Sequence, residues 1–241
     1  MKEELDQHFM KDKDAINLIV KSLNLSKSDN VLEIGAGNGA LTKELIGKCN
    51  LTIIEKDKEM TNLKALNCKI VYGDGVRYLK KNKRFNKITG NIPYSISEPL
   101  FNVLLKTNFG LAVFTVGIKF AKKLTNVIDS KLSIIAPLFF NIKIIKTLPK
   151  SSFHPEPKTE SAIILIKPKK RLKKHDKILK DFFLQTDKLA KNALRESLTK
   201  LGYTKRESRS IIEKNKLNLS KNTKNISLED AKKIKEIIYS F

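Results

Sequence analysis

The sequence predicts an α/β protein with a mostly parallel, doubly wound sheet, followed by a small α-helical domain. Two observations lead to this fold class. Short apolar segments typical of buried strands alternate with helical spacing up to residue 168, and only helical spacing continues beyond it. The chain has 241 residues, 41% of them hydrophobic, which is enough for one large α/β domain and a small appendage. We therefore expect one domain over 1–168 and a second over 169–241.

The first of these domains is predicted to contain strands and helices in alternation. Apolar residues at helical spacing predict a helix over 12–25 with Asp12 as its N-cap, and a second helix follows over 40–46. Strands are expected at 31–34, 51–55, 69–72 and 161–166, with one more that ends at Asn91. The apolar segments 111–116 and 132–140 are compatible with either a strand or a helix.

A basic run over 167–177 marks the change in composition. It holds seven Lys or Arg residues and one acidic residue. We expect a linker that also contacts phosphate, although a merely solvated surface run has the same composition. Helical spacing follows this run, and Ser227 with Asp230 three residues later predicts the N-cap of a last helix.

The charge of the chain indicates the class of partner. There are 48 Lys and Arg residues against 25 Asp and Glu residues, a net charge of +23. Such an excess favours phosphate polyanions, with an anionic membrane surface as the competing explanation. No apolar run approaches the roughly 20 residues that a membrane span needs, and the N-terminal residues do not resemble a signal peptide.

Cysteine and histidine usage points to a reduced environment and to no metal site. Cys49 and Cys68 are isolated and match no metal or redox spacing, and the three His residues are scattered. We therefore expect free thiols in a cytoplasmic protein, with no bound metal.

The segment Asn91–Tyr94, with the sequence Asn-Ile-Pro-Tyr, is the most specific signal for chemistry. It follows a predicted strand. The Asn91 side chain and the carbonyl of Ile92 or Pro93 could accept hydrogen bonds from an exocyclic amino group, and the Tyr94 ring could stack on a base. Stacking of this kind contributes roughly 1–3 kcal/mol per base. The pattern indicates chemistry on the amino group of adenine or cytosine, although a simple turn with a packed Tyr is the alternative.

The first predicted strand leads into a glycine-rich turn that predicts a nucleotide site. Residues 33–39 have the sequence Glu-Ile-Gly-Ala-Gly-Asn-Gly. The spacing differs from the dinucleotide fingerprint, and the acid Glu33 before the first glycine would repel phosphate. Such a loop suits a ligand with a cationic or zwitterionic end, such as S-adenosylmethionine. Glu55 and Asp74 end the next two strands, where they could meet the ribose hydroxyls and the adenine amino group, because ligands bind at the carboxyl ends of such strands.

In these motifs the chain resembles the small-subunit ribosomal RNA adenine dimethyltransferases, which use S-adenosylmethionine. Asp6–Met10 is similar to the family's N-terminal G-Q-[NHC]-F-L motif, and residues 33–39, Glu55, Asp74 and Asn91–Tyr94 match its cofactor and catalytic motifs in order. The segment 153–162 matches F-x-P-x-P-K-V-x-S-A closely, and 191–198 resembles a family helix. The resemblance covers most of the chain.

The resemblance implies a Rossmann-like methyltransferase domain with a small helical C-terminal domain, and it implies roles for named residues. The implied cofactor contacts are Gln7, His8, Met10, Gly35, Gly37, Glu55, Asp74 and Asn91. The expected catalytic group is Asn91, Pro93, Tyr94 and Phe153. We expect Tyr94 on one face of the target base and Phe153 on the other, with ordinary core packing as the alternative for Phe153. The expected product is dimethylated adenine, at two adjacent adenines in a loop near the 3′ end of small-subunit rRNA.

Contacts with RNA are expected from basic side chains in three segments of the chain. They are Lys119, Lys122, Lys123, Lys169, Lys170, Arg171, Lys191 and Arg195.

The chain also departs from the family at two places. Asp6 replaces a Gly, and residues 117–124 replace a Q-K-E-x-A-x-R-[LM] stretch, with Gly117 at the Gln position and Lys119 at the Glu position. These departures concern the fit to RNA more than methyl transfer.

Three other functions remain open at this stage. A large-subunit rRNA methylase of the antibiotic-resistance type shares the N-terminal and catalytic motifs. A ribosome-assembly or transcription factor of the same fold would have lost catalysis, but its expected damage to the cofactor loop or to Asn91–Tyr94 is absent. A DNA adenine methylase uses the same tetrapeptide but lacks the other motifs. We expect a monomer that acts on the small ribosomal subunit or its precursor.

Overall fold

The computed structural model describes residues 7–215, 217 and 219–240, so Asp6 lies outside the described residues. The chain divides into two compact units, one formed by the residues up to 122 together with 142–168, and the other by 123–141 together with 169–241. One division falls after residue 168, where the composition of the chain changes. Residues 123–141, in contrast, belong to the C-terminal unit, although the sequence places them in the first domain.

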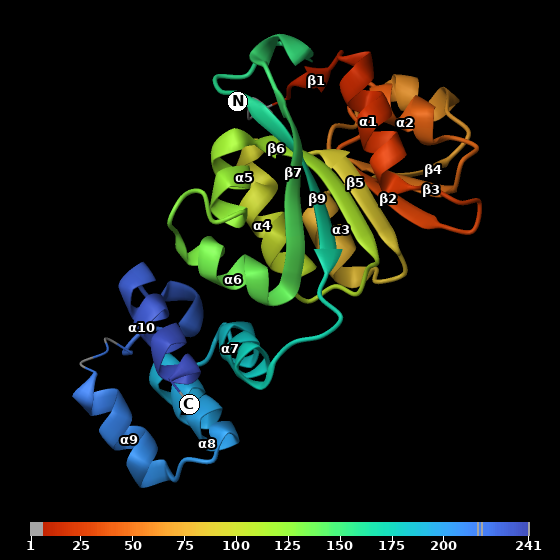
Figure 1. Ribbon diagram of the computed structural model, residues 1–241. Helices are drawn as coiled ribbons and strands as arrows, with labels where there is room; N and C mark the ends of the chain where they lie inside the picture. Colours follow the sequence, from red (N-terminus) through yellow and green to blue (C-terminus); the bar gives the residue numbers. More distant parts are fainter. Residues whose placement is uncertain (1–6, 216, 218, 241) are drawn as a thin grey trace. The chain divides into compact units, whose positions relative to one another are not determined.

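The first unit is built on a seven-stranded sheet with the strand order β4-β3-β2-β5-β6-β9-β7 (Figure 1). Its strands are β2 (Asn30–Ile34), β3 (Asn50–Glu55), β4 (Lys69–Tyr72), β5 (Lys87–Asn91), β6 (Leu111–Gly117), β7 (Phe140–Leu148) and β9 (Ser161–Pro168). The strands from β2 to β6 pair in parallel, and β9 is antiparallel to β6. The predicted mostly parallel α/β sheet is therefore confirmed.

The helices of this unit begin where the strands end. They are α1 (Lys13–Leu23), α2 (Ala40–Leu45), α3 (Gly75–Lys81), α4 (Tyr94–Leu104) and α5 (Ile118–Leu124). The last of these, α5, crosses the division between the units. Short 3₁₀ turns lie at Thr61–Ala65 (η1) and Lys150–Ser152 (η2). Asp12 caps α1 as predicted, since its side chain accepts a hydrogen bond from the backbone N–H of Ala15. The central strands β3 and β6 are buried along almost their whole length, as expected for a sheet covered on both faces.

A separate two-stranded sheet joins two segments that are far apart in the sequence. It pairs β1 (Phe9–Met10) with β8 (Phe153–His154) in antiparallel fashion. This pairing brings the N-terminal motif next to the start of the Phe153–Ala162 segment. Sequence periodicity predicted neither of these strands, because two residues are too short to show a period.

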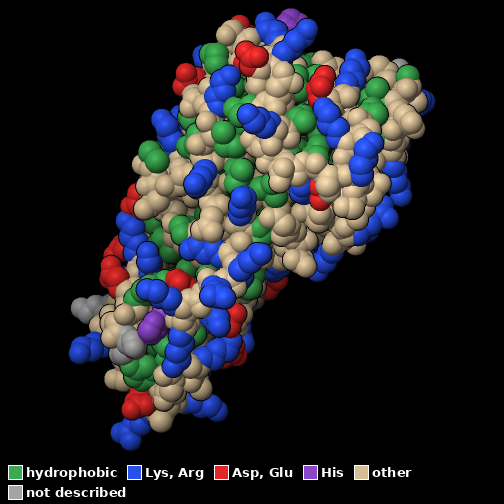
Figure 2. Space-filling model, turned by 45° about the vertical axis from the view of Figure 1, so that its right-hand side comes forward, with side chains coloured by type: hydrophobic (Ala, Val, Ile, Leu, Met, Phe, Trp, Pro, Cys, Tyr) green, Lys and Arg blue, Asp and Glu red, His purple; other side chains and the backbone are tan. Residues whose placement is uncertain are grey.

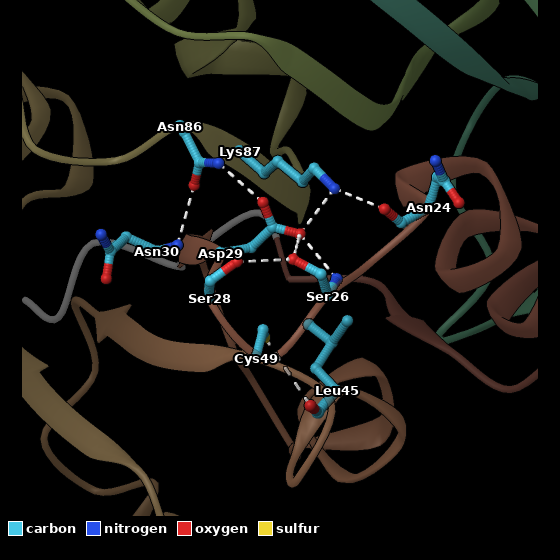
Figure 3. A network of polar contacts seen from close by, with 9 residues as sticks. All are labelled: Asn24, Ser26, Ser28, Asp29, Asn30, Leu45, Cys49, Asn86 and Lys87. Carbon is cyan, nitrogen blue, oxygen red and sulfur yellow. Dashed lines mark hydrogen bonds and ion pairs between the residues drawn. The ribbon is translucent and has the colours of Figure 1, made fainter.

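A polar network around Asp29 holds the amino-terminal ends of β2 and β5 together (Figure 3). The buried Asp29 carboxylate pairs with the Lys87 ammonium at 2.7 Å and accepts hydrogen bonds from Ser26 and Asn86. Burial alone would raise the pKa of Asp29, but these partners outweigh it and lower the pKa to about 2. Asn86 also accepts a hydrogen bond from the Asn30 backbone N–H, at 2.8 Å. The network therefore ties β5 to β2 at one end, and the opposite end of β5 carries Asn91.

The second unit is helical, as predicted for the C-terminal region. It contains α6 (Lys131–Phe139), α7 (Lys174–Leu184), α8 (Ala190–Leu201), α9 (Lys205–Lys214), the 3₁₀ turn η3 (Thr223–Asn225) and α10 (Leu228–Tyr239). The predicted cap of the last helix is confirmed, because Ser227 accepts a hydrogen bond from the Asp230 backbone N–H. The helix α6 is almost entirely buried and packs against α7 and α10, which explains why residues 123–141 group with this unit.

The basic run over 167–177 is only partly a linker. β9 extends to Pro168 and α7 begins at Lys174, so the connecting segment is 169–173. Within the described part of the chain, none of the helices combines the length and the apolar character needed to cross a bilayer.

Candidate active site

The carboxyl ends of four neighbouring strands, β2 to β5, open into one cavity in the first unit. Ten of the residues singled out in the sequence line it: Gln7, His8, Gly35, Gly37, Glu55, Asp74, Asn91, Pro93, Tyr94 and Phe153. Met10, the remaining predicted cofactor residue, does not line this cavity. Its side chain is 7% exposed and belongs to the hydrophobic core, because residues alternate between the two sides of β1.

The glycine-rich turn after β2 forms one wall of the cavity. Gly35 and Gly37 have φ angles of +74° and +54°, in the left-handed region that favours glycine. A Cβ atom on Gly37 would also lie 2.9 Å from the Phe9 ring, which packs over the turn from β1. Side chains at these two positions would be strained or would clash, so glycine allows the backbone of this turn to approach a ligand closely.

The carboxylate of Glu55, at the end of β3, is held rigidly by the backbone. Its Oε2 accepts a hydrogen bond from the Gly37 N–H at 2.8 Å, and its Oε1 accepts one from the Asp57 N–H at 2.8 Å. The side chain is 5% exposed and lines the cavity. Each carboxylate oxygen has a second lone pair, so Glu55 can also accept hydrogen bonds from two hydroxyl groups of a ribose.

Asp74 lies at the end of the neighbouring strand β4 and caps helix α3. Its Oδ1 accepts a hydrogen bond from the Arg77 N–H at 2.8 Å, which leaves Oδ2 as an acceptor toward the cavity. Two acidic groups at adjacent strand ends, beside a glycine-rich turn, match the donors of an adenosine and the positive charge of a sulfonium. The residues present therefore fit S-adenosylmethionine.

Glu33 was expected to face the ligand from the glycine-rich turn, but its side chain is buried instead. Its charge in the glycine-rich turn favoured a cationic ligand, but Glu33 is 1% exposed and is not among the residues that line the cavity. Its Oε2 accepts a hydrogen bond from the Thr42 hydroxyl at 2.8 Å. Burial raises the pKa of Glu33 to about 8, only partly offset by Thr42, and the Glu55 carboxylate adds to the rise. The acidic character of the site comes from Glu55 and Asp74 instead.

The raised pKa of Glu33 predicts that the free energy of unfolding depends on pH. The folded chain keeps a proton on Glu33 that the unfolded chain loses near the ordinary pKa of 4.5, so stability falls as pH rises from there through about 8. Glu33→Gln, which stays neutral, should remove this decline. Urea unfolding of both proteins near the two ends of that pH range should show the wild type losing at least about 1.4 kcal/mol relative to the variant. Parallel pH profiles would show that Glu33 is ionised in the folded protein.

The orientation of the Asn91 side chain follows from its partner. Its Nδ2 donates a hydrogen bond to the backbone carbonyl of His8 at 2.6 Å. A carbonyl only accepts hydrogen bonds, so the amide nitrogen must face His8, and Oδ1 remains as an acceptor. His8 is held in turn by its ring, whose Nδ1 donates to the Pro155 carbonyl at 2.9 Å.

The structure also decides between the two backbone carbonyls that could serve beside Asn91. The Pro93 carbonyl accepts hydrogen bonds from the Ile96 N–H and the Ser97 hydroxyl, both at 3.1 Å, in the first turn of α4. The Ile92 N–H donates to the Thr115 carbonyl at 2.9 Å, which ties this peptide to β6. Because the Pro93 carbonyl already has two donors, the arrangement favours the Ile92 carbonyl as the second acceptor expected beside Asn91.

The two aromatic rings expected to enclose a base are exposed to different extents. The Tyr94 side chain is half-buried and lies 6.3 Å from the His8 ring, measured between ring centroids. Phe153 lines the cavity but is 1% exposed, and its ring packs in the core with Leu148 and Ile163. Tyr94 therefore offers a face for stacking in this conformation, and Phe153 offers little.

Several cavity residues escaped sequence reasoning. Phe9, Lys56, Ser95 and Ser161 line the cavity, and none of them was assigned a role. Ser161 stands inside the Phe153–Ala162 segment, so the resemblance gave its position but no function. Lys56 and Ser95 directly follow the predicted residues Glu55 and Tyr94, and that adjacency is a signal that could have found them.

The basic side chains expected to contact RNA are all accessible at least in part. Lys119 and Lys122 are exposed on α5 in the first unit, and in the second unit Lys170, Arg171 and Lys191 are exposed while Lys123, Lys169 and Arg195 are half-buried. The Nε atom of Arg195 is buried and has no hydrogen-bond partner among the described residues. Figure 2 shows Lys and Arg side chains spread widely over the visible face, so charge alone does not single out one patch.

Comparison with known proteins places the chain in a family. The family model described as ribosomal RNA adenine dimethylase matches residues 1–239. A probable ribosomal RNA small subunit methyltransferase A from Pyrococcus furiosus is 32% identical over 98% of this chain and 92% of its own length. A protein of the same name from Methanococcus maripaludis is 33% identical, over 88% of this chain and 87% of its own length.

Two solved structures share the fold over nearly the whole chain. A dimethyladenosine transferase from Plasmodium falciparum superposes with a TM-score of 0.64 at 24% identity, over 94% of this chain and 96% of that one. The 23S rRNA methyltransferase ErmE superposes with a TM-score of 0.62 at 20% identity, over 96% and 99%. With the family model matched over 1–239 and these archaeal relatives, the chain belongs to the ribosomal RNA adenine dimethylase family.

Proposed function

We propose that this chain transfers methyl groups from S-adenosylmethionine to the exocyclic amino groups of two adjacent adenines, in a loop near the 3′ end of small-subunit rRNA. One observation carries the proposal. Asn91 and Ile92 line the same cavity as Glu55 and Asp74, and the hydrogen bond from Asn91 Nδ2 to the His8 carbonyl leaves the Asn91 amide oxygen as an acceptor. An acceptor pair for an amino group thus lies beside a site suited to the cofactor.

The cofactor site is formed by residues of the first unit alone. Glu55 would hold the ribose hydroxyls, Asp74 the adenine amino group, and the turn at Gly35 and Gly37 the rest of the molecule. When bound, S-adenosylmethionine supplies a methyl group that its sulfonium already activates.

The residues of the chain then have to align the amine and exclude water, which can supply several kcal/mol of the barrier. The lone pair of an adenine amino group is delocalised into the ring. When Asn91 Oδ1 and the Ile92 carbonyl accept its two hydrogens, the lone pair becomes localised and points away from both of them. No strongly basic side chain is needed for this step.

The target adenine must leave its stack to reach the cavity, as in other enzymes that modify bases. Tyr94 then replaces the lost stacking on one face of the base. A second transfer requires that the monomethylated amine turn its methyl group away from the acceptors. The dimethylated product is therefore part of this proposal.

The rival functions have weaker support. The relatives that share about a third of their residues with this chain are named for the small subunit, whereas the likeness to ErmE, at 20% identity, concerns the fold alone. A factor that has lost catalysis would not need the His8 carbonyl to hold Asn91 in an accepting orientation. We further propose that the chain acts as a cytoplasmic monomer on the small subunit or its precursor.

The basic connecting segment should contribute phosphate contacts to RNA binding. We predict that replacing Lys169, Lys170 and Arg171 together with Ala weakens binding and lowers the slope of log K against log salt concentration by about 2, since each lost phosphate contact removes about 0.7–0.9. Filter binding to rRNA across a series of salt concentrations measures this slope.

A matched control removes the same charge from α1 and the loop after it, at Lys13, Lys21 and Lys27, which are all exposed. This control variant should lower the affinity for rRNA only by the small amount that follows from the reduced net charge of the protein. An unchanged slope in the first variant would show that the segment is a passive linker.

Incubation with labelled S-adenosylmethionine and separated ribosomal subunits tests the function itself. We expect label in small-subunit rRNA, at two adjacent adenines that carry two methyl groups each when the modified nucleotides are mapped. Label confined to the large subunit would establish the rival activity, and the absence of label from both subunits and from their precursors would exclude catalysis.

A further inference from the structure

The ring of Tyr94 rests against two residues that oppose each other in the sheet. Gly117 is the last residue of β6, and it pairs with Ser161, the first residue of the antiparallel strand β9. Both contact Tyr94, which begins α4 after β5. We call Gly117 and Ser161 the Tyr94 seat.

Ser161 fixes the outer end of the tyrosine. Its hydroxyl lies 2.9 Å from the Tyr94 hydroxyl, which also donates a hydrogen bond to the Thr159 carbonyl at 3.2 Å. The tyrosine hydroxyl has a single proton, which it donates in the hydrogen bond to the Thr159 carbonyl. The Ser161 hydroxyl must therefore be the donor in its hydrogen bond to the tyrosine oxygen. Ser161 is 2% exposed, and a hydrogen bond in such a place holds its partner firmly.

Gly117 has no side chain, and this allows one edge of the same ring to lie close to its backbone. A Cβ atom there would lie 3.2 and 3.3 Å from the Cδ1 and Cε1 atoms of Tyr94, which is tighter than ordinary van der Waals contact, and 3.5 Å from its Cγ atom. Gly117 is not among the residues with a positive φ, so other residues could adopt its backbone conformation. The close approach of the ring, and not the backbone, therefore calls for glycine at this position.

We propose that Gly117 and Ser161 are positioning residues for methyl transfer, since together they set the plane of the Tyr94 ring on which the target adenine stacks. This inference rests on the proposed function. Asn91 and Ile92 fix where the amino group can bind, and the ring plane fixes the tilt of the base about that point. A tilt moves the lone pair away from the methyl group, so the seat controls the rate after RNA has bound.

The first test measures kcat and KM for rRNA at saturating S-adenosylmethionine. Gly117→Ala should lower kcat about tenfold, because a displaced ring misaligns the base. Ser161→Ala should lower it about fivefold, the equivalent of one neutral hydrogen bond. In both variants KM for RNA should change little, since phosphate contacts supply most of the affinity. The affinity and stoichiometry of S-adenosylmethionine binding should stay at wild-type values, which shows that the variants are folded.

Double variants separate positioning from a general structural effect. Tyr94→Phe keeps the ring but removes the hydroxyl with both of its hydrogen bonds, so it should lower kcat at least as much as Ser161→Ala. Combining the two changes should be no worse than Tyr94→Phe alone. In the Tyr94→Phe background Gly117→Ala should keep its full effect, and in the Tyr94→Ala background it should have none. Ser197→Ala removes an equally buried hydroxyl in the second unit and should leave kcat unchanged.

Each result bears on the inference. Wild-type kcat in Gly117→Ala, or an undiminished effect of that change in the Tyr94→Ala background, would overturn it. If Ser161→Ala does not fold, Tyr94→Phe tests the same hydrogen bond, and a wild-type kcat there would overturn the role of Ser161. A wild-type protein that transfers no methyl group to rRNA would refute the proposed function and the inference with it, whereas an active wild type with equally active seat variants would refute the inference alone.

Discussion

Asn91→Ala is expected to lower kcat for methyl transfer by about 10³-fold or more, an effect of the size seen when a hydrogen-bonding group aimed at the reacting atoms is removed. In the proposed mechanism the amide oxygen accepts one of the two amino hydrogens, and the hydrogen bond from Nδ2 to the His8 carbonyl holds the amide in that orientation. Single-turnover transfer of labelled methyl to rRNA measures the loss directly. Affinity for S-adenosylmethionine should fall only in part, because Glu55 and Asp74 remain.

The control for this variant is Asn82→Ala. Asn82 is also a half-buried asparagine whose Nδ2 donates to a backbone carbonyl, that of Tyr78, but it lies at the end of α3 and does not line the cavity. Its loss should leave kcat near the wild-type value. Full activity of Asn91→Ala on ribosomal subunits would remove the mechanism.

Glu55→Gln is expected to weaken binding of S-adenosylmethionine by about 30- to 150-fold. Both carboxylate oxygens of Glu55 accept backbone N–H groups, from Gly37 and from Asp57. A glutamine amide has one oxygen, so its NH₂ group must face one of these donors and leave it without an acceptor. The NH₂ group also cannot accept a hydrogen bond from a ribose hydroxyl. The loss of that one hydrogen bond between the ribose and a charged group, about 2–3 kcal/mol, corresponds to the expected change in affinity.

Isothermal titration with S-adenosylmethionine measures the effect of Glu55→Gln without RNA. Glu44→Gln serves as the control, because Glu44 is an exposed acid on α2 that pairs only with Lys48 at 3.8 Å among the described residues. If both variants bind equally well, Glu55 does not contact the cofactor and the assignment of the ribose site is wrong.

The fold and the position of the site follow closely from the sequence. Buried parallel strands leave continuous apolar runs, and the residues that end those runs directly follow them in the chain, so the sequence alone predicts that Gly35, Glu55, Asp74 and Asn91 lie at one edge of the sheet. The structure brings all four into one cavity. Three strands were not predicted. The strands β1 and β8 are too short to show a pattern, and β7 (Phe140–Leu148) was also missed.

Features that depend on distant partners could not be predicted in this way. The apolar segment 132–140 looked like part of the first domain, but it forms α6 and packs with α7 and α10. Glu33 looked like a charge facing the ligand, but it is buried against Thr42. In both cases the local sequence is compatible with either environment, and the packing of other elements selects one.

The sequence by itself determined the fold class, the edge of the sheet that carries the site and the kind of chemistry that Asn91–Tyr94 supports, because each depends on residues that are close together in the chain. Only the tertiary structure decided that the Ile92 carbonyl rather than that of Pro93 is available, that the His8 carbonyl turns the amide oxygen of Asn91 outward, and that Gly117 and Ser161 hold Tyr94. Hydrogen bonds and ring contacts of this kind join residues many positions apart, and their geometry exists only when the strands have paired in one register.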